Sequence, residues 1–483
     1  MSVWLEALEQ SLSISPHGVH EVESGQEKPY PSLLQASKRW EMLLASYQED
    51  FVAVVLPNGI AYLEVYLGVL RSRNIFNPIP YFVEASELES ILNYVEPVMV
   101  VTDRTDLKER FGSRYKVVDP SESYTAKPND EVPTKPVSDD DIACLYYSSG
   151  TTGNPKGVLY SHENVYELIR SICKGFKFHQ DTRQFAFLPF GHTASINYNI
   201  LPALLLGSPL FTSLGFEHLR ANFFKVLAQH KVNYTEVVPS VLLMLLKLRH
   251  RVDDLDLSAL EFVGCGSSTL ALESQRQFME SYGLPVANLY GLSETGPCHI
   301  DDPRDSGWSP GSIGFPLDVN QCRIAEDGET LLKGPNVFVG YYKNPGLYGE
   351  VVRDGWFHTG DLGRQDDDGR FFFTDRKKDL IIKSGINIVP AEIEEVIYKC
   401  ENVLECVVVG KEDPVHGEVI AAVVAPRDSS KSERLVEEVR AVCKAHLSSY
   451  KVPSIIQVVE RIPQTHSGKL LRKDVRKQIA EQV

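Results

Sequence analysis

The chain has 483 residues, of which 43% are apolar and 24% are charged, a balance that is ordinary for a soluble globular protein. Its formal net charge is −16, and an acidic balance without a basic block argues against a nucleic-acid partner. At roughly 150 residues per domain, the length fits about three domains or two large ones.

Neither a targeting signal nor a transmembrane segment is predicted. No Lys or Arg precedes Lys28, whereas a secretory signal needs a basic start followed by an apolar run. The most apolar stretch, residues 196–211, is short for a membrane span and is interrupted by Asn197, Asn199 and Pro202. The eight cysteines are scattered without a CxxC pair, so we expect neither a disulfide framework nor a zinc site. These features indicate a reduced, cytoplasmic protein.

Short β-rich runs alternate with helical patterns along the first part of the chain. Residues 51–56 (FVAVVL) and 98–102 (VMVVT) are typical of buried strands. Residues 164–173 place apolar side chains at helical spacing, with Ser161 or Asn164 as the cap. This alternation predicts an α/β fold.

The last hundred residues contain an α/β set of their own. Pro390 marks a helix start, and apolar spacing predicts a second helix near residues 435–442. Strands are expected at the ends of residues 403–424 and again at 455–459. A charged run, DRKKD at residues 375–379, separates two apolar runs. We place a domain boundary there, although such a run by itself is typical of an exposed loop.

The strongest functional signal is residues 146–158, YYSSGTTGNPKGV. A predicted strand leads into a loop of Ser, Thr and Gly that ends in Lys156. Glycines let the backbone approach a phosphate, and the hydroxyls and Lys156 add donors and charge. The order of residues differs from a Walker A loop. A flexible linker is the alternative, but linkers rarely follow a buried strand and end in PKG. The predicted nucleotide-binding residues are Ser148, Ser149, Gly150, Thr151, Thr152, Gly153 and Lys156.

This loop resembles the nucleotide loop of the adenylate-forming superfamily, which includes acyl- and aryl-CoA synthetases, luciferases and peptide-synthetase adenylation domains. Further motifs match in the same order, from about Tyr30 to Lys473. The resemblance implies an α/β fold with a large N-terminal domain, residues 1–377, and a small mobile C-terminal lid domain, residues 378–483. It also implies ATP and Mg²⁺ as cofactors and a small carboxylic acid as substrate.

Residues 290–295, YGLSET, are similar to the family's adenine and magnesium motif. The resemblance implies that Tyr290 stacks on adenine and that Gly291 lines the nucleotide. It further implies that Glu294 holds magnesium together with Thr151, and that Thr295 touches the α-phosphate. A hard cation does favour oxygen ligands shared with phosphates. By itself, Glu294 would more often be a surface carboxylate.

Two more motifs complete the predicted nucleotide site. Residues 266–270, GSSTL, resemble the adenine-edge loop, with Ser268 and Thr269 replacing the usual Ala-Pro. The implied nucleotide contacts there are Gly266, Ser267 and Ser268. In HTGDL, residues 358–362, Asp361 matches the carboxylate that binds the ribose hydroxyls, and Arg376 matches a second ribose contact.

The catalytic residues of the C-terminal part also follow from the resemblance. Lys378 falls at the family's hinge position. Residues 381–390, IIKSGINIVP, resemble the loop used in thioester formation, where Gly385 lets a pantetheine arm pass. Residues 463–469, PQTHSGK, match the block that ends in the adenylation lysine, here Lys469.

The acid pocket departs from the family pattern. In LPFGH, residues 188–192, Gly191 replaces an aromatic residue, while His192 keeps the position beside the acyl carboxylate. Residues 193–197 are expected to line the pocket. Thr193 stands close to where peptide-synthetase domains for α-amino acids place an Asp, and a buried ammonium without a partner is costly. An α-amino acid is therefore disfavoured, while aryl, medium-chain and branched acids stay open.

The expected reaction is ATP-dependent activation of the acid to an acyl-adenylate, followed by transfer to a thiol, with coenzyme A (CoA) favoured. About seventy residues separate Gly291 from Gly360, which leaves no room for the insertion usual in ligases that load carrier proteins. A stand-alone adenylation enzyme that loads the phosphopantetheine of an acyl-carrier protein is the alternative. A non-catalytic nucleotide-binding regulator is a further one. The pattern does not identify the acid or the oligomeric state.

Overall fold

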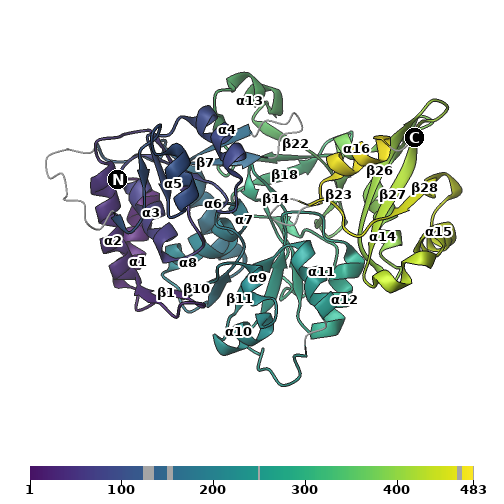
Figure 1. Ribbon diagram of the computed structural model, residues 1–483, viewed down its shortest axis with the longest axis horizontal. Coiled ribbons are helices and arrows are strands. Elements are labelled where there is room, and N and C mark those ends of the chain that lie inside the picture. Colours follow the sequence, from purple (N-terminus) through teal and green to yellow (C-terminus); the bar gives the residue numbers. More distant parts are fainter. Residues whose placement is uncertain (123–134, 149–155, 249–250, 465–469, 482–483) are drawn as a thin grey trace.

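The computed structural model describes residues 1–122, 135–148, 156–248, 251–464 and 470–481 (Figure 1). It is a mixed α/β protein with a large N-terminal domain and a smaller C-terminal domain, which confirms the predicted fold class. In Figure 1 the C-terminal domain lies at the right, in yellow and yellow-green. No helix of the described residues is long and apolar enough to cross a membrane.

Two seven-stranded sheets form the frame of the N-terminal domain. The first has the order β13-β12-β11-β9-β10-β1-β2 and is parallel except for its β1–β2 edge. Its strands are β1 (Gly18–Glu21), β2 (Glu27–Pro29), β9 (Gln184–Ala186), β10 (Leu210–Thr212), β11 (Tyr234–Val237), β12 (Phe262–Cys265) and β13 (Val286–Asn288). Helices cover this sheet, so strand residues are buried on both faces.

The second sheet has the order β20-β8-β7-β4-β3-β5-β6, and its β7–β8 and β8–β20 pairs are antiparallel. Its strands are β3 (Phe51–Val55), β4 (Ile75–Pro78), β5 (Met99–Thr102), β6 (Val117–Val118), β7 (Ile142–Ser148), β8 (Lys156–Ser161) and β20 (Gly340–Tyr341). Strands β3 and β5 confirm the strands predicted from the apolar runs. The pairing of β20 with β8 joins segments that lie about 180 residues apart.

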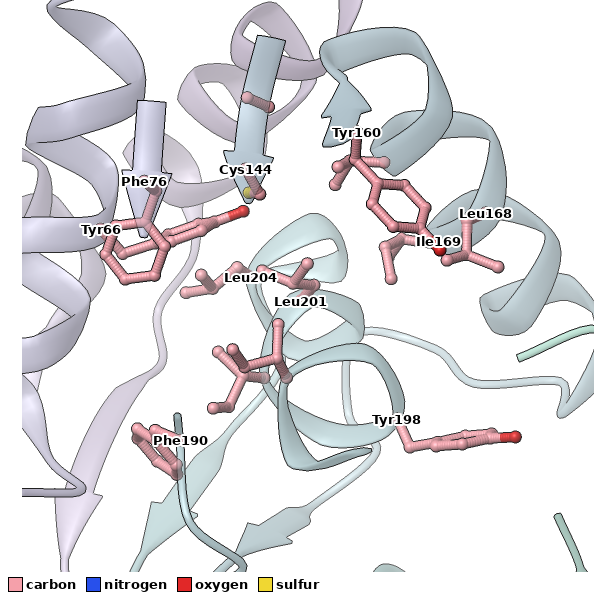
Figure 2. Close-up of a cluster of buried hydrophobic side chains, with 14 of the residues drawn as sticks. Tyr66, Phe76, Cys144, Tyr160, Leu168, Ile169, Phe190, Tyr198, Leu201 and Leu204 are labelled. Carbon is pink, nitrogen blue, oxygen red and sulfur yellow. The ribbon is translucent and has the colours of Figure 1, made fainter. Parts of the chain in front are cut away.

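The described helices of this domain include the predicted one, α6, which begins at His162. Its cap is a reciprocal pair, since the Asn164 backbone N–H donates to the Ser161 side chain and the Ser161 N–H donates to the Asn164 side chain. Figure 2 shows Leu168 and Ile169 pointing from α6 toward Tyr160. The helices are α1 (Val3–Ile14), α2 (Tyr30–Leu44), α3 (Ile60–Arg71), α4 (Ala85–Val95), α5 (Thr105–Phe111), α6 (His162–Gly175), α7 (Thr193–Ser195), the π-helix η2 (Ile196–Ile200), α8 (Leu201–Leu206), α9 (Phe216–Leu219), α10 (Phe223–Gln229), α11 (Pro239–Leu248), α12 (Leu272–Tyr282) and α13 (Pro345–Val351).

A third, five-stranded sheet lies next to the C-terminal domain and carries two of the predicted ribose contacts. Its strands are β18 (Gln321–Ile324), β19 (Glu329–Lys333), β21 (Val352–Arg353), β22 (Trp356–Gln365) and β23 (Phe371–Arg376). Two short pairs precede it in the chain. They are β14 (Gly291–Leu292) with β15 (Gly296–Pro297), and β16 (His299–Ile300) with β17 (Phe315–Pro316).

The C-terminal domain follows the short 3₁₀ helix η3 (Lys377–Asp379) and has its own sheet and two hydrophobic clusters. The predicted strands and both predicted helices are confirmed here. The boundary between residues 377 and 378 stays a prediction. The elements are β24 (Ile381–Lys383), β25 (Ile386–Ile388), α14 (Pro390–Ile397), β26 (Val403–Asp413), β27 (Gly417–Pro426), η4 (Ser429–Arg434), α15 (Leu435–His446), η5 (Ser449–Lys451), β28 (Ile455–Val458) and α16 (Arg472–Glu481).

Candidate active site

The phosphate-loop motif is the turn of the β7–β8 hairpin, with Ser148 paired to Lys156 across its open end. The residues between them that were predicted to bind nucleotide lie outside the described residues; they are Ser149, Gly150, Thr151, Thr152 and Gly153. The Lys156 ammonium lies 5.7 Å from the centroid of the Tyr341 ring, because Tyr341 pairs with Val158 on the neighbouring strand β20. The hairpin therefore presents a cation where the loop begins and ends.

Tyr341 also connects this hairpin to the YGLSET motif. Its hydroxyl donates to Glu294 Oε1 at 2.9 Å, and burial followed by the charge of Glu294 raises the pKa of Tyr341. The backbone N–H of Phe338 donates to the Glu294 carbonyl at 2.9 Å and fixes the motif against β20. The carboxylate of Glu294 and the ammonium of Lys156 thus share one aromatic neighbour, which the sequence analysis did not identify.

Glu294 is partly exposed, and its remaining carboxylate oxygen suits a hard cation. Among the described residues, no group of three or more His, Cys, Asp and Glu side chains is placed to hold a metal ion. A magnesium ion bound to nucleotide phosphates needs only one or two protein carboxylates, because the phosphates and water supply its other oxygens. The side chain of Glu294 therefore fits the predicted role.

The two hydroxyls that flank Glu294 differ in exposure. Thr295 is fully buried, and its hydroxyl donates to the Gly296 carbonyl at 2.8 Å. A contact between Thr295 and a phosphate would require this bond to break, so its predicted role stays a prediction. Ser293 is partly exposed. A hydroxyl directly before Glu294 was visible in the sequence and offers the more accessible donor.

The predicted ribose residues lie together at the edge of the third sheet. Asp361 and Arg376 are paired across β22 and β23, with Arg376 Nε 3.4 Å from Asp361 Oδ1. The Tyr290 hydroxyl donates to Asp361 Oδ2 at 2.9 Å, and burial followed by the Asp361 charge raises the pKa of Tyr290. The ring of Tyr290 lies between His299 and Phe373, and only 8% of the residue is exposed. Its stacking on adenine stays a prediction.

The adenine-edge loop follows the carboxyl end of β12, the position where ligands bind in open α/β sheets. A Cβ on Gly266 would stand 2.9 Å from Leu289 Cβ, so glycine lets this loop pack against the residue before Tyr290. Ser267 is exposed and has a positive φ of 69°, which is uncommon for a residue other than glycine. Ser268 is partly exposed beside it.

The predicted acid segment approaches the same region. His192 is half-buried and precedes α7, and Thr193 is the first residue of that helix. A Cβ on Gly191 would stand 2.4 Å from the backbone nitrogen of Pro80, which explains why no aromatic side chain is present there. Asn197 Nδ2 lies 3.3 Å from the position of a Cβ on Gly296. The acid segment therefore contacts the loop that carries Glu294.

The predicted C-terminal residues differ in their distance from this centre. Partial burial, followed by the charge of Arg376, lowers the pKa of Lys378, and the charges of Asp361 and Lys156 also act on it. Lys378 therefore lies beside both the ribose and the phosphate residues. Gly385 is at an exposed turn between β24 and β25, with a φ of 79° and nothing within 4 Å of a Cβ. Lys469 lies outside the described residues.

Two family descriptions match the chain. AMP-binding enzyme matches residues 22–342, and the AMP-binding enzyme C-terminal domain matches residues 392–469. The chain belongs to the AMP-binding enzyme family. It is 32% identical over 441 residues to a feruloyl-CoA synthase of an Amycolatopsis species, covering 89% of this chain and 88% of that one. It is 30% identical over 444 residues to a sulfoacetate–CoA ligase of Cupriavidus necator, covering 87% and 86%.

A solved structure supports the same placement. The o-succinylbenzoate CoA synthetase of Bacillus subtilis, in complex with its acyl-adenylate intermediate, matches with a TM-score of 0.86 and 26% identity, over 99% of this chain and 98% of that one. These relatives are CoA ligases for different acids. This AMP-binding enzyme is accordingly an ATP-dependent acid–thiol ligase.

Proposed function

We propose that this enzyme activates a small carboxylic acid with ATP and transfers the acyl group to CoA. The observation that carries the proposal is the convergence of Lys156, Glu294 and Asp361 from three distant segments, joined by Tyr341 and by the position of Lys378. These are residue types suited to phosphates, a magnesium ion and ribose hydroxyls, respectively. The acceptors of the related CoA ligases support CoA as the thiol.

In this proposal, each part of the nucleotide has its own contacts. Asp361 accepts from the ribose hydroxyls, with Arg376 as a second ribose contact, and Tyr290 and Gly291 line the adenine. The backbone of residues 266–268 meets the adenine edge. Ser148 and Lys156 bind phosphate oxygens together with the loop between them. Glu294 and Thr151 hold a magnesium ion, which would neutralise phosphate charge.

The acid then reacts in two steps. A carboxylate oxygen attacks the α-phosphorus, and the bond to pyrophosphate breaks, which gives the acyl-adenylate. His192 orients the carboxylate, and Lys469 and Thr295 neutralise charge that builds on the α-phosphate. In the second step a thiolate attacks the acyl carbonyl and AMP leaves. Gly385 lets the pantetheine arm of CoA pass at this stage.

A panel of acids assayed by ATP–pyrophosphate exchange tests the first step. Free acyl-CoA in a coupled assay supports CoA, whereas labelling of a carrier protein instead would favour the alternative acceptor. Complete absence of exchange over a broad panel would indicate a nucleotide-binding regulator. We also propose that the enzyme is cytoplasmic, since all eight cysteines are free thiols, as expected in a reducing compartment.

The proposed pocket predicts the class of acid. Thr193 offers no charge to pair with an α-ammonium, and Ala194, Ser195 and Ile196 are small or apolar. We expect pyrophosphate exchange with aryl or aliphatic carboxylates and little with the twenty protein α-amino acids. Exchange dominated by a single α-amino acid would show that these residues do not define the pocket.

The ribose assignment predicts a defect specific to ATP. Asp361→Asn removes the charge that strengthens two ribose hydrogen bonds, and such bonds are each worth about 1.5–3 kcal/mol. We expect the KM for ATP to rise by roughly ten- to a hundredfold, with the KM for the acid changed little. Asp181→Asn, at an exposed side chain, is the control and should change neither. An equal rise in both KM values would point to a general structural role for Asp361.

A further inference from the structure

Three buried polar side chains that the proposed mechanism does not use lie on one face of the first sheet. Glu236, Tyr198 and Tyr234 are 1%, 5% and 1% exposed. Both carboxyl oxygens of Glu236 and both tyrosine hydroxyls lack a hydrogen-bond partner in the part of the chain that the structure describes. We call these three residues the Glu236 cluster. Buried polar atoms are nearly always paired, so three together indicate a missing partner.

Strand β11 and its neighbour β12 define the position of two members. Tyr234 and Glu236 are two residues apart on β11, so their side chains leave the same face of the sheet. Gly264 is the cross-strand partner of Glu236, and the Tyr234 hydroxyl lies 2.5 Å from where a Cβ on Gly264 would stand. Glu236 Oε1 lies 3.6 Å from the corresponding position at Gly266. The two glycines thus leave the polar groups of β11 space above β12.

Tyr198 comes from the π-helix η2, which packs against β9 and β11. Figure 2 shows its side chain pointing away from Phe190, Leu201 and Leu204. Its ring centroid is 6.2 Å from that of Phe176, which is 6.0 Å from that of Tyr234. Burial, followed by the charge of Glu236, raises the pKa of both Tyr198 and Tyr234.

The cluster lies between the two segments assigned to the acid and to adenine. Tyr198 directly follows Asn197, whose amide contacts the Gly296 position beside Glu294. Glu236 adjoins Gly266, the first residue of the adenine-edge loop, at the carboxyl ends of β11 and β12. A carboxylic acid held with its carboxylate at His192 would extend its far end along η2, toward the cluster.

We propose that the Glu236 cluster recognises the far end of the acid substrate, and that this end carries a neutral hydroxyl or carbonyl group. This inference rests on the proposed acid–CoA ligase function and narrows its substrate class. An apolar end would leave the carboxyl and both hydroxyls unpaired in the complex, which a polar site of this kind discriminates against strongly. Burial raises the pKa of Glu236 well above its usual range, so the empty site holds a neutral acid that can both donate and accept.

The test compares acids that differ only at the far end, using ATP–pyrophosphate exchange. The pairs are 3-phenylpropanoate with 3-(4-hydroxyphenyl)propanoate, and hexanoate with 6-hydroxyhexanoate. The amines 3-(4-aminophenyl)propanoate and 6-aminohexanoate form the cationic or weakly basic arm. We expect the wild-type kcat/KM to favour a hydroxylated member by at least about tenfold. Glu236→Leu should abolish that preference, and Glu236→Gln, which keeps a neutral donor and acceptor, should retain most of it.

Thr235→Val is the matched control on the same strand. The Thr235 side chain leaves the opposite face of β11, and its hydroxyl donates to the Phe185 carbonyl at 2.9 Å. Its substitution should change all acids in proportion. Equal use of both members of every pair by the wild type, or an equal effect of Glu236→Leu on both, would overturn the inference. Preference for the 6-amino acid would overturn the assignment of a neutral group.

A second measurement is independent of turnover. An unpaired buried carboxyl destabilises the empty protein, so Glu236→Leu should raise Tm relative to wild type, and a lower Tm would indicate a structural role instead. Loss of exchange with every acid would contradict the proposed function rather than this inference. Calorimetric binding of the same acid pairs to the wild type then decides: tighter binding of the hydroxylated members upholds the inference, and equal binding overturns it.

Discussion

Lys469→Ala is expected to slow acyl-adenylate formation by about 10²–10³-fold while the protein stays folded. Attack on the α-phosphorus builds negative charge on the equatorial oxygens, and one well-placed cation acts mainly on that charge. The residues around position 469 form their own contacts, since Leu470 bridges to Gln464 and Arg472 donates to Glu394 at 2.7 Å. Loss of a single ammonium should therefore leave the domain intact. Pyrophosphate exchange at saturating ATP and acid measures the effect.

Lys477→Ala is the control for charge alone. Lys477 is exposed on α16, and its ammonium is 3.9 Å from the Glu481 carboxylate, a surface pair of little energetic weight. It should change exchange by less than about twofold. Near-wild-type exchange in Lys469→Ala would remove this lysine from the chemistry and leave Lys156 as the described cation nearest to Glu294.

Local signals predicted the elements well, but not their long-range pairing. The apolar runs at β3 and β5, and the apolar face and cap of α6, follow from side-chain periodicity and capping chemistry alone. No local signal places β20 against β8. That pairing brings Tyr341 between Lys156 and Glu294, and it depends on contacts between segments that are remote in the sequence.

The candidate site shows the same limit. Motif resemblance identified Asp361 and Arg376, which the structure does bring together. Resemblance gave no indication of Glu236, because a glutamate that alternates with apolar residues in a strand usually faces solvent. Here helices cover both faces of a parallel sheet, so the side chain is buried. Exposure also distinguishes Ser293 from Thr295, a difference that adjacent hydroxyl residues cannot reveal in sequence.

The second large effect concerns the two half-reactions, which we propose use different faces of a mobile C-terminal domain. Arg472 lies near the hinge, since Glu394 and then Asp375 and Asp379 raise its pKa against the effect of burial. The segment after Lys469 therefore faces the third sheet. Gly385 is instead at an exposed turn, where the Ser384 N–H donates to the His416 carbonyl of the same domain at 2.7 Å. One placement of the domain does not serve both residues, so rotation is expected.

Lys378→Pro should form the adenylate but transfer it to CoA at least tenfold more slowly, because proline fixes φ at the proposed hinge (~10-fold or more for a blocked conformational step). Lys378→Ala is the matched control. It removes the same side chain, including its charge beside Asp361 and Lys156, but keeps the torsional freedom. If the alanine variant loses thioester formation as severely as the proline variant, the side chain rather than the torsion is responsible.

Gly385→Leu should behave like Lys378→Pro, because a side chain at the exposed turn would block the pantetheine path. Its φ of 79° adds strain, so Gly283→Leu serves as the control: Gly283 has a φ of 67°, and neither glycine has an atom within 4 Å of a Cβ. Lys469→Ala should show the reverse pattern and convert pre-made acyl-adenylate to thioester at close to the wild-type rate. Single-turnover assays of adenylation and of thioester formation separate the halves. Proportional loss of both halves in Lys378→Pro, Gly385→Leu and Lys469→Ala would contradict rotation, because a single fixed closed state couples the two steps in every variant.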